Sequence, residues 1–519
     1  MALKITYATM SADNEELNAS FEKAVVDVQS RLDQSHGVIV NGEHRGDRDL
    51  YEEVSPIDRD ILVGRYAQAT TDDVDDAISA ASVFAPEWEA WGWEARRDLM
   101  LTAADIMEEQ IFEISALMSY EVGKSRLESL GDVAETVEFF RYYARQITDH
   151  DGFVTPLNSL GANETNTSVL RPYGVWAVIS PFNFPMALAA GPSVGALLTG
   201  NTVIVKPSNT GALMALEFYR VMDEAGLPNG ALHILTGAGV VIGEHMTHHD
   251  DVDGITFTGS YPVGMHLLQT ASEKRPKPVS CEMGGKNPVI VTRSADLDLA
   301  TQGIVRGAFG LSGQKCSATS RVYVEHSVHD ELVDRLVDAT ADIQVGSPFD
   351  RSSFMGPLIE RGVVTRFERA VDEVRSSGGT ILVGGNVLTD GDLARGHFVE
   401  PTVVTAPLNS WIWSEELFMP LVAVTGVSGL EEGLALSNDT EFGLTAGLFT
   451  TDEGEIETWF NGIEAGVTYV NRAAGATTGA WPDIQSFGGW KGSGTSGAGG
   501  GGQWYLRQYM REQSRTLIR

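Results

Sequence analysis

Three residues have the types and surroundings needed for two-step covalent chemistry on a carbonyl compound. Cys316, one of only two cysteines in 519 residues, stands where a loop feeds the strand-like run 322–324. A thiolate there could form a covalent adduct, and the carboxylate of Glu282, which precedes two glycines, could activate the water that cleaves it. Asn183 lies between two aromatic residues and two prolines, and its amide could hold an oxyanion.

Each of these residues also has a purely structural interpretation. A free cysteine is commonly a buried small apolar residue, and a Glu or Asn beside glycines or prolines is commonly part of a turn. One disulfide, between Cys281 and Cys316, is arithmetically possible. So few cysteines nevertheless favour a reducing compartment, and Cys281 is expected to be a buried structural thiol.

The first part of the chain is predicted to be mostly helical. Residues 1 to about 35 form an acidic helical extension, and 36–43 is a strand that ends in an Asn-Gly turn, with 61–66 as its expected partner. The apolar spacing then predicts helices over 74–83, 96–109 and 111–120, and from about residue 128.

From residue 169 the pattern changes to apolar strands that alternate with helices. Strands are predicted at 169–179, 202–207, 231–235 and 254–260, and in a second segment at 288–291, 321–324, 381–383, 398–404 and 422–424. This alternation indicates an α/β fold with parallel sheets covered on both faces, which bind ligands at the carboxyl ends of their strands. The last segment, 510–518, is strand-like and could pair with another chain, so at least a homodimer is expected.

The composition excludes several classes of partner. The chain has 71 acidic and 37 basic residues, a formal net charge of -34, and 43% hydrophobic residues. A surface this anionic repels nucleic acid and anionic membranes, and its scattered charges suggest a high-salt cytoplasm.

No window has the length of a transmembrane helix, and the first residues lack the features of a signal peptide, so a cytoplasmic location is expected. Histidines at 245, 248 and 249 stand beside two aspartates, but no metal site is expected there.

Seven short motifs in order resemble the aldehyde dehydrogenase superfamily, over about residues 36 to 519. They are Pro-Phe-Asn-Phe-Pro at 181–185, Lys-Pro-Ser at 206–208, Phe-Thr-Gly-Ser at 257–260, Glu-Met-Gly-Gly-Lys at 282–286, Gly-Gln-Lys-Cys at 313–316, Glu-Glu-Leu-Phe at 415–418 and Phe-Gly-Gly-Trp-Lys-Gly-Ser-Gly at 487–494. The resemblance implies a Rossmann-type cofactor domain (1–152 and 173–282), an α/β catalytic domain (283–485) and a small β bridging and oligomerisation element (153–172 and 496–519).

The resemblance also implies a mechanism and a cofactor. Cys316 would attack the aldehyde, the Asn183 amide and the Cys316 backbone N–H would stabilise the oxyanion, and Glu282 would activate water to release the acid. NAD or NADP would accept the hydride. The implied cofactor residues are Lys206 and Glu416 at a ribose, Phe418 near the nicotinamide, Gly239, Gly259, Ser260 and Val263 near the pyrophosphate and adenine, and Ile179, Ser180, Ser208, Asn209, Gly243, Phe257, Met283 and Gly284 around them.

Asn209 leaves the choice between NAD and NADP open. Many family members have a Glu at this position, which accepts hydrogen bonds from both hydroxyls of the adenosine ribose. A neutral amide neither repels a 2′-phosphate nor selects strongly for a free hydroxyl. NAD is slightly favoured.

The resemblance is greatest to the branch that oxidises glutamate γ-semialdehyde, the Δ1-pyrroline-5-carboxylate dehydrogenases. In that branch Ser317, Gly479 and Ala480 would hold the substrate's α-carboxylate, as successive backbone N–H groups can, and Phe184 and Phe487 would flank its aliphatic chain. The chain departs from the branch in about three extra residues before 478, in Trp481-Pro482-Asp483, which adds bulk and charge, and in Met419, which replaces a usual Gly.

Three alternatives differ in substrate or in chemistry. The substrate could be another semialdehyde, such as α-ketoglutarate semialdehyde or succinic semialdehyde. A CoA-acylating enzyme would need no deacylating carboxylate, so Glu282 argues against it. A non-catalytic binding or structural protein is disfavoured because Cys316, Glu282 and Asn183 are all present.

Overall fold

The computed structural model describes residues 14–474 and 481–519, and it begins with the predicted helical extension. Helix α1 (Glu15–Asp27) starts at Asn14, whose side-chain oxygen accepts a hydrogen bond from the Leu17 backbone N–H, and it buries Leu17 and Phe21. Short helical turns lie elsewhere at Val28–Arg31, Asp151–Phe153, Gly239–Gly243, Gly310–Gly313, Gly391–Arg395, Trp411–Trp413 and Tyr505–Tyr509.

The single strand predicted at 36–43 is two strands in two different sheets. β1 (Gln34–His36) pairs in parallel with β5 (Leu62–Ala67), whereas β2 (Val38–Val40) forms a hairpin with β3 (Glu43–Arg45) around Asn41 and Gly42. The predicted partner at 61–66 is therefore correct only for the first part of the run. Strand β4 (Leu50–Val54) completes the small sheet, antiparallel to β5.

All four of the predicted N-terminal helices are confirmed. They are α2 (Thr71–Ala90), α3 (Gly92–Glu109), α4 (Ile111–Val122) and α5 (Arg126–Asp149). A capping box starts α2, because the Thr70 hydroxyl and the Asp73 carboxylate accept each other's backbone N–H. Gly123, with a φ of 72°, ends α4 in the left-handed conformation that favours glycine.

The first large sheet has the strand order β12-β11-β8-β9-β10-β2-β3, in which β8 to β12 are parallel. The strands are β8 (Val175–Ile179), β9 (Thr202–Lys206), β10 (Leu232–Ile234), β11 (Gly254–Thr258) and β12 (Val279–Glu282), and the helices are α6 (Ala187–Leu198), α7 (Ala212–Glu224), α8 (Glu244–His248) and α9 (Tyr261–Thr270). Trp176 and Val178 join the core around α6, whereas Val175 and Ala177 join the core around α2. Alternate residues point to opposite faces, so this sheet is covered on both faces, as predicted.

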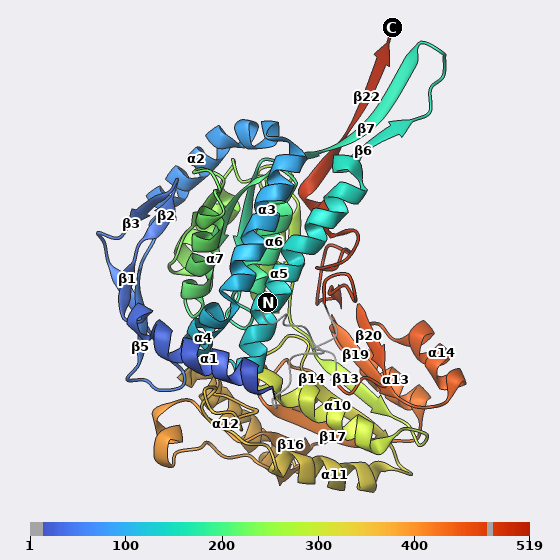
Figure 1. The fold of residues 1–519 in the computed structure, drawn as a ribbon. Coiled ribbons are helices and arrows are strands. Elements are labelled where there is room, and N and C mark those ends of the chain that lie inside the picture. Colours follow the sequence, from blue (N-terminus) through green and yellow to red (C-terminus); the bar gives the residue numbers. More distant parts are fainter. Residues whose placement is uncertain (1–13, 475–480) are drawn as a thin grey trace.

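The second large sheet has the order β15-β16-β17-β14-β13-β19-β20, and all its pairs are parallel except β15 with β16. Two strands, β19 (Thr445–Phe449) and β20 (Val467–Val470), were not predicted. The others are β13 (Asn287–Val291), β14 (Thr319–Glu325), β15 (Thr380–Val383), β16 (Thr402–Thr405) and β17 (Leu421–Val427), and the helices are α10 (Leu297–Phe309), α11 (His329–Ala341), α12 (Arg361–Ser376), α13 (Leu430–Asn438) and α14 (Glu453–Gly462). The two sheets lie one above the other in Figure 1.

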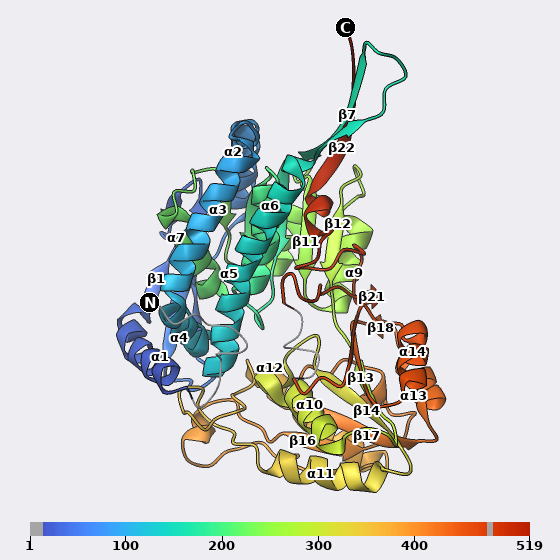
Figure 2. The same cartoon turned by 45° about the vertical axis from the view of Figure 1, so that its right-hand side comes forward.

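A three-stranded sheet forms an arm that projects from the rest of the molecule (Figure 2). Its order is β22-β7-β6, with β6 (Val154–Leu157), β7 (Glu164–Pro172) and β22 (Met510–Ile518) all antiparallel. The single strand predicted at 169–179 is therefore divided: β7 belongs to the arm and β8 to the first large sheet. Gly174, with a φ of 138°, lies between them and lets the chain change direction. The strand predicted at 510–518 is confirmed, and one of its edges pairs with β7 of the same chain. Strands β18 (Phe442–Gly443) and β21 (Trp490–Lys491) form a separate two-stranded pair.

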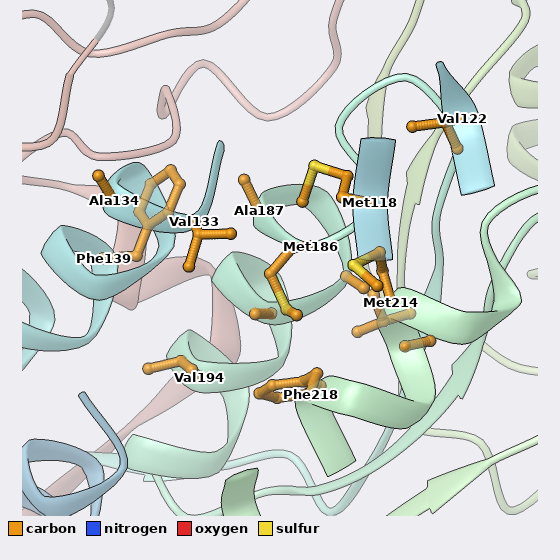
Figure 3. Close-up of a cluster of buried hydrophobic side chains, with 14 of the residues drawn as sticks. Met118, Val122, Val133, Ala134, Phe139, Met186, Ala187, Val194, Met214 and Phe218 are labelled. Carbon is orange, nitrogen blue, oxygen red and sulfur yellow. The ribbon is translucent and has the colours of Figure 1, made fainter. Parts of the chain in front are cut away.

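Small residues let α6 pack tightly in the centre of the core. Figure 3 shows Met186, the N-cap of α6, and Ala187 and Val194 of α6 among side chains of α4, α5 and α7. A Cβ at Gly195 would lie 2.7 Å from the Tyr509 ring, and one at Gly191 would lie 3.2 Å from Phe139. Each large side chain that this packing buries stabilises the fold by about 1.5–3 kcal/mol. The loop before α6 carries Asn183, so close packing of α6 fixes the position of that loop.

Candidate active site

The loop that carries Cys316 is held by its own backbone conformation and by bonds from 356–359. Leu311 and Ser312 have positive φ angles of 51° and 55°, which turn the chain sharply after α10. The Ser312 hydroxyl donates a hydrogen bond to the Gly356 carbonyl (2.8 Å), and the Gln314 side-chain oxygen accepts one from the Ile359 N–H (2.8 Å). Residues in unfavourable conformations persist where the surrounding structure enforces them, so the loop before Cys316 is firmly positioned.

Asn287, the first residue of β13, holds the backbone around Cys316 by hydrogen bonds. The Asn287 side-chain NH₂ donates to the carbonyls of Cys316 (2.7 Å) and Ala318 (2.9 Å), and its oxygen accepts from the Thr445 N–H (3.0 Å). A Cβ at Gly285 would lie 2.4 Å from the Cys316 carbonyl oxygen. Asn287 was not among the predicted site residues, although it directly follows the motif at 282–286.

The Cys316 side chain combines partial accessibility with strong desolvation. Burial, followed by the nearby carboxylates of Glu416 and Glu282, raises the pKa of the Cys316 thiol to about 12. The backbone N–H groups of Cys316 and Ser317 face the sulfur and oppose this shift. The thiol is therefore neutral at pH 7 and needs a base before it can attack a substrate.

Glu282 ends β12 and is enclosed by the glycine-rich segment 488–494. Its Oε2 accepts a hydrogen bond from the Gly489 N–H (3.0 Å), and a Cβ at Gly494 would lie 3.0 Å from its Oε1. Burial raises the pKa of Glu282 to about 8. A carboxyl group with this pKa is a stronger base than an ordinary glutamate and can exchange protons near neutral pH. The first large sheet thus supplies Glu282 and the loop before β14 of the second sheet supplies Cys316.

Asn183 is buried, 4% exposed, in the loop between β8 and α6. Its backbone carbonyl accepts a hydrogen bond from Lys124 Nζ (2.9 Å), and Lys124 pairs with Asp132 Oδ2 (2.8 Å) with both side chains fully buried. The other Asp132 oxygen accepts from the Ala187 N–H (2.8 Å). A buried ion pair between the start of α5 and the loop before it therefore anchors the loop that carries Asn183.

A second buried ion pair connects α5 with the predicted nucleophile. Lys315 Nζ lies 2.8 Å from Glu128 Oε1, and Lys315 directly precedes Cys316. Lys315 and Lys124 outweigh the effect of burial and hold the pKa of Glu128 below its usual range. Lys124 Nζ and Lys315 Nζ lie 3.7 and 6.0 Å from the centre of the Phe184 ring. The predicted substrate residue Phe184 thus lies where the Asn183 loop meets the Cys316 loop, but none of the four charged residues was predicted as part of the site.

Lys206 and Glu416, the predicted ribose-binding residues, both have shifted pKa values. Lys206 ends β9, its Nζ donates to the Pro207 carbonyl (2.8 Å), and burial lowers its pKa to about 8. Glu416 Oε1 accepts from the Gly285 N–H (2.9 Å), and burial raises its pKa to about 7. A Cβ at Gly284 would lie 2.3 Å from Glu416 Oε2. The glycine at 284 is therefore required for Glu416 to approach the end of β12.

The other predicted cofactor residues gather at the carboxyl ends of the strands of the first sheet. Ile179 ends β8 and Ser180 follows it, and Ser208 and Asn209 follow β9. Phe257 lies near the end of β11, Gly259 and Ser260 follow that strand, and Met283 and Gly284 follow β12. A Cβ at Gly239 would lie 3.8 Å from Lys206 Nζ. Gly243 ends the helical turn at Gly239–Gly243, and the Phe418 ring lies 5.9 Å from that of Phe182, edge to face.

Unsatisfied polar groups and exposed apolar side chains on this surface fit a dinucleotide. Ser180 Oγ and Asn209 Oδ1 are buried without a hydrogen-bond partner among residues 14–474 and 481–519. Val240, Val241 and Val263 are 87%, 48% and 47% exposed beside Gly239 and Ser260. Buried polar groups are normally hydrogen-bonded, and apolar side chains can enclose a flat ring such as adenine. The residues present therefore fit a nicotinamide dinucleotide.

The predicted substrate residues are only partly described. Ser317 is buried, with its carbonyl accepting from the Thr445 hydroxyl (3.3 Å), and Phe487 is paired through its backbone with Gly500. Gly479 and Ala480 lie outside the described residues. The negative charge expected from Asp483 is balanced, because Arg145 lies 2.9 Å from its carboxylate.

Cys281 and Lys286 are both buried, the first in β12 and the second in the loop that follows it. Cys281 is buried and both cysteines are free, so the disulfide is not formed, and burial raises the pKa of the Cys281 thiol to about 12. The buried Nζ of Lys286 has no hydrogen-bond partner in the described chain. In 14–474 and 481–519, no helix is long and apolar enough to cross a membrane, and no group of three or more His, Cys, Asp or Glu is arranged to hold a metal.

The fold and the site are those of an α/β enzyme in which a cysteine from one parallel sheet meets a glutamate from another. Residues 43–514 match the aldehyde dehydrogenase family, and the chain belongs to that family. It is accordingly an oxidoreductase that acts on aldehydes.

Curated relatives and solved structures give the same assignment. The chain is 36% identical over 505 residues to 1-pyrroline-5-carboxylate dehydrogenase of Geobacillus sp. (strain WCH70), covering 96% of this chain and 95% of the relative. It is 37% identical over 510 residues to 1-pyrroline-5-carboxylate dehydrogenase 2 of Halalkalibacterium halodurans, covering 97% and 96%. The crystal structure of 1-pyrroline-5-carboxylate dehydrogenase from Thermus with bound NAD is 30% identical and superposes with a TM-score of 0.94, covering 100% of both chains.

Proposed function

We propose that this chain oxidises L-glutamate γ-semialdehyde, the open form of Δ1-pyrroline-5-carboxylate, to glutamate with NAD as the preferred cofactor. The observation that carries the substrate is the similarity over nearly the full length to relatives named for that reaction.

The proposed reaction begins with loss of the Cys316 proton, which Glu282 accepts, and attack of the sulfur on the aldehyde carbon. The oxyanion of the resulting thiohemiacetal accepts hydrogen bonds from the Asn183 amide and the Cys316 N–H. Each such donor is worth about 10²–10³ in rate in other enzymes. When bound, the nicotinamide cofactor accepts the hydride that leaves the thiohemiacetal.

The second half of the reaction releases the acid from Cys316. After the hydride has left, the substrate is a thioester of Cys316. Glu282, with its pKa raised to about 8 by burial, first releases to solvent the proton that it took from Cys316. It then removes a proton from water, and the hydroxide attacks the thioester carbon. The carbon–sulfur bond breaks, the carboxylic acid leaves, and the thiolate regains its proton.

The experiment that tests this function measures NADH formation in high salt with a panel of aldehydes that includes pyrroline-5-carboxylate, succinic semialdehyde and an uncharged aldehyde. The wild type is expected to prefer pyrroline-5-carboxylate, and Cys316→Ala is expected to lose turnover by at least about 10³-fold. Full activity in the variant would refute the mechanism. A preference for the uncharged aldehyde would refute the substrate assignment.

The cofactor preference is a separate part of the proposal. Asn209 Oδ1, which has no hydrogen-bond partner in the described chain, can accept a hydrogen bond from a ribose hydroxyl, which supports NAD. It carries no charge to repel the 2′-phosphate of NADP. We expect NAD to have a kcat/KM a few-fold higher than NADP. A preference for NADP would contradict this assignment.

We also propose a domain division, an assembly and a location. Residues 1–152 and 173–282 form the cofactor domain, 283–485 form the catalytic domain, and 153–172 and 496–519 form the bridging element. The presence of two separate large sheets supports this division.

The exposed strand β22 at the edge of the arm supports a homo-oligomer, which light scattering would test. The free cysteines and the net charge of -34 support a reducing, high-salt cytoplasm. Equal stability in molar and millimolar salt would contradict the salt adaptation.

A further inference from the structure

The peptide bond between Cys316 and Ser317 is held at its carbonyl by one buried side chain. Asn287, which is 3% exposed, donates hydrogen bonds from its side-chain NH₂ to the carbonyls of Cys316 (2.7 Å) and Ala318 (2.9 Å). Its side-chain oxygen accepts a hydrogen bond from the Thr445 N–H (3.0 Å). Backbone groups thus use both ends of the amide, and the side chain cannot turn round without losing these bonds.

The anchored carbonyl determines where the N–H of the same peptide points. This peptide is trans. A trans peptide is planar, with its C=O and its N–H on opposite sides, and the N–H of this unit belongs to Ser317. Because Asn287 holds the Cys316 carbonyl on one side, the Ser317 N–H is directed to the other side, where it faces the Cys316 sulfur.

A tight turn at 315–318 leaves this N–H available to the sulfur. The Ala318 N–H donates a hydrogen bond to the Lys315 carbonyl (3.0 Å), which closes a four-residue turn with Cys316 and Ser317 at its centre. Within the described chain, neither the Cys316 N–H nor the Ser317 N–H donates to a backbone carbonyl. Successive N–H groups of this kind can stabilise an anion such as a thiolate.

Without Asn287 the central peptide of this turn could rotate. Rotation would direct the Cys316 carbonyl oxygen toward the sulfur in place of the N–H, and the rotated turn needs a positive φ at Ser317. Leu311 and Ser312 in the same loop have positive φ angles of 51° and 55°, so residues with a side chain do adopt that conformation here. The hydrogen bond from Asn287 fixes the peptide in the orientation that favours a thiolate.

We propose that Asn287 is a positioning residue, which holds the Cys316 carbonyl, keeps the Ser317 N–H directed at the Cys316 sulfur and so stabilises the thiolate. The thiolate forms when Cys316 gives its proton to Glu282, and it forms again when the carbon–sulfur bond of the thioester breaks. Both halves of the reaction therefore use this N–H. The inference rests on the proposed function, because it requires Cys316 to be the nucleophile.

The test measures how fast iodoacetamide alkylates Cys316, because the thiolate is the reactive form. Mass spectrometry of the peptide that carries Cys316 separates this reaction from any reaction at Cys281. In Asn287→Ala, the rate constant at each pH between 7 and 9 is expected to fall about 10- to 100-fold, as for loss of a hydrogen bond to a charged group. The kcat/KM for pyrroline-5-carboxylate is expected to fall by a similar factor, and the Kd for NAD to stay unchanged.

The direction of the change separates positioning from shielding. If Asn287 only packed the loop over the sulfur, its removal would expose Cys316 and alkylation would become faster. A faster or unchanged rate in Asn287→Ala would overturn the inference. Asn287→Ser keeps a small polar side chain with one donor and replaces the Ala variant if that variant does not fold. Its rate is expected to lie several-fold below that of the wild type, and a rate equal to or above the wild type would again overturn the inference.

Two control variants remove comparable hydrogen bonds that do not orient this peptide. Thr445→Val removes the hydroxyl that donates to the Ser317 carbonyl (3.3 Å), on the neighbouring peptide. Asn201→Ala removes a fully buried amide that accepts from the N–H groups of Tyr173 (2.9 Å) and Gly174 (3.0 Å), just before β9 and away from the site. Both variants are expected to keep the alkylation rate within about two-fold of the wild type. A loss in Asn201→Ala as large as that in Asn287→Ala would show general destabilisation and would overturn the inference.

Alkylation needs neither aldehyde nor cofactor, so it tests this inference separately from the proposed function. If alkylation and turnover both fall in Asn287→Ala but the preferred aldehyde is not pyrroline-5-carboxylate, the substrate assignment fails and the role of Asn287 stands. If alkylation falls while kcat/KM for the preferred aldehyde does not, the role of Asn287 in the reaction is refuted and the proposed function stands.

Discussion

The residues around Cys316 form two groups, one at α5 and one at the strand ends of the first sheet, and the two groups satisfy their polar atoms in opposite ways. On the α5 side, two fully or largely buried lysines meet carboxylates of the same protein, at Lys124–Asp132 and Lys315–Glu128. On the side of the first sheet, Lys206 has only a backbone partner, and Ser180 Oγ and Asn209 Oδ1 have none in the described chain. The two lysines on the α5 side have carboxylate partners without a ligand, whereas the other side has polar groups that a ligand can satisfy. Substitutions on the first side should therefore affect folding, and those on the second should affect cofactor binding.

The largest effect is expected from Lys124→Met. It leaves Asp132 buried without its counter-charge and removes the hydrogen bond to the Asn183 carbonyl. Breaking one partner of a buried pair costs about 3–5 kcal/mol of unfolding free energy, which urea unfolding in high salt would measure. The double variant Lys124→Met with Asp132→Leu should recover part of this loss. Unchanged stability in the single variant would show that the α5 side is not held by this pair.

The pH dependence should separate kcat from the KM for the cofactor. Glu282 has a pKa raised to about 8, so its basic form increases as pH rises, and kcat should rise about tenfold per pH unit below pH 8. Lys206 has a pKa lowered to about 8, so its ammonium is lost as pH rises through 8, and the cofactor KM should then increase. Steady-state kinetics between pH 6 and 10 would measure both pH profiles, and each midpoint is expected within about one pH unit of 8. A cofactor KM that stays constant above pH 8 would contradict the role of Lys206.

Lys206→Met should weaken cofactor binding while leaving the fold intact. The KM for the cofactor is expected to rise about tenfold, the equivalent of about 1.4 kcal/mol. The free energy of unfolding should change little, because the variant removes one hydrogen bond to the Pro207 carbonyl and also removes a desolvated amine. Isothermal titration with NAD and urea unfolding would measure the two quantities. A loss of stability as large as that of Lys124→Met would remove the distinction between the two sides.

The smallest effect is expected from Asn209→Glu. A carboxylate at this position repels the 2′-phosphate of NADP and accepts hydrogen bonds from the ribose hydroxyls of NAD. The ratio of kcat/KM for NAD over NADP should increase several-fold, which initial rates with each cofactor would show. Asn209→Gln is the control of equal size without charge. An unchanged ratio in the Glu variant would place Asn209 away from the adenosine ribose.

The sequence predicted the parallel sheets and the residues at their strand ends, because both depend on local pattern. Apolar runs between helices predict strands, and short motifs identify loops such as 181–185 and 282–286. The run 169–179 was wrongly joined, because Pro172 and Gly174 divide it between two sheets although its apolar character continues across them. β19 and β20 were missed in a region where alanine, glycine and threonine interrupt the apolar pattern.

The partners of buried charges could not be predicted in the same way. Lys315 pairs with Glu128, and Asn287 accepts a hydrogen bond from Thr445, although the partners are far apart in the sequence. No periodic pattern in the sequence relates such partners. Lys315 lies within the motif at 313–316, but the residues around Lys315 and Lys124 in the sequence do not indicate that the two side chains are buried. The sequence thus identified some residues of the site. The ion pairs and hydrogen bonds that hold these residues in place could be found only from the folded structure.

Helix α5 also connects two distant parts of the molecule by a single rigid element. It runs from Arg126 to Asp149, about 36 Å in length. Its first turns hold the Asn183 loop and the residue next to Cys316, and its last turn leads through Asp151–Phe153 into β6 of the arm. A contact between the arm and another subunit therefore restrains one end of α5, and the other end of the same helix positions the residue next to Cys316.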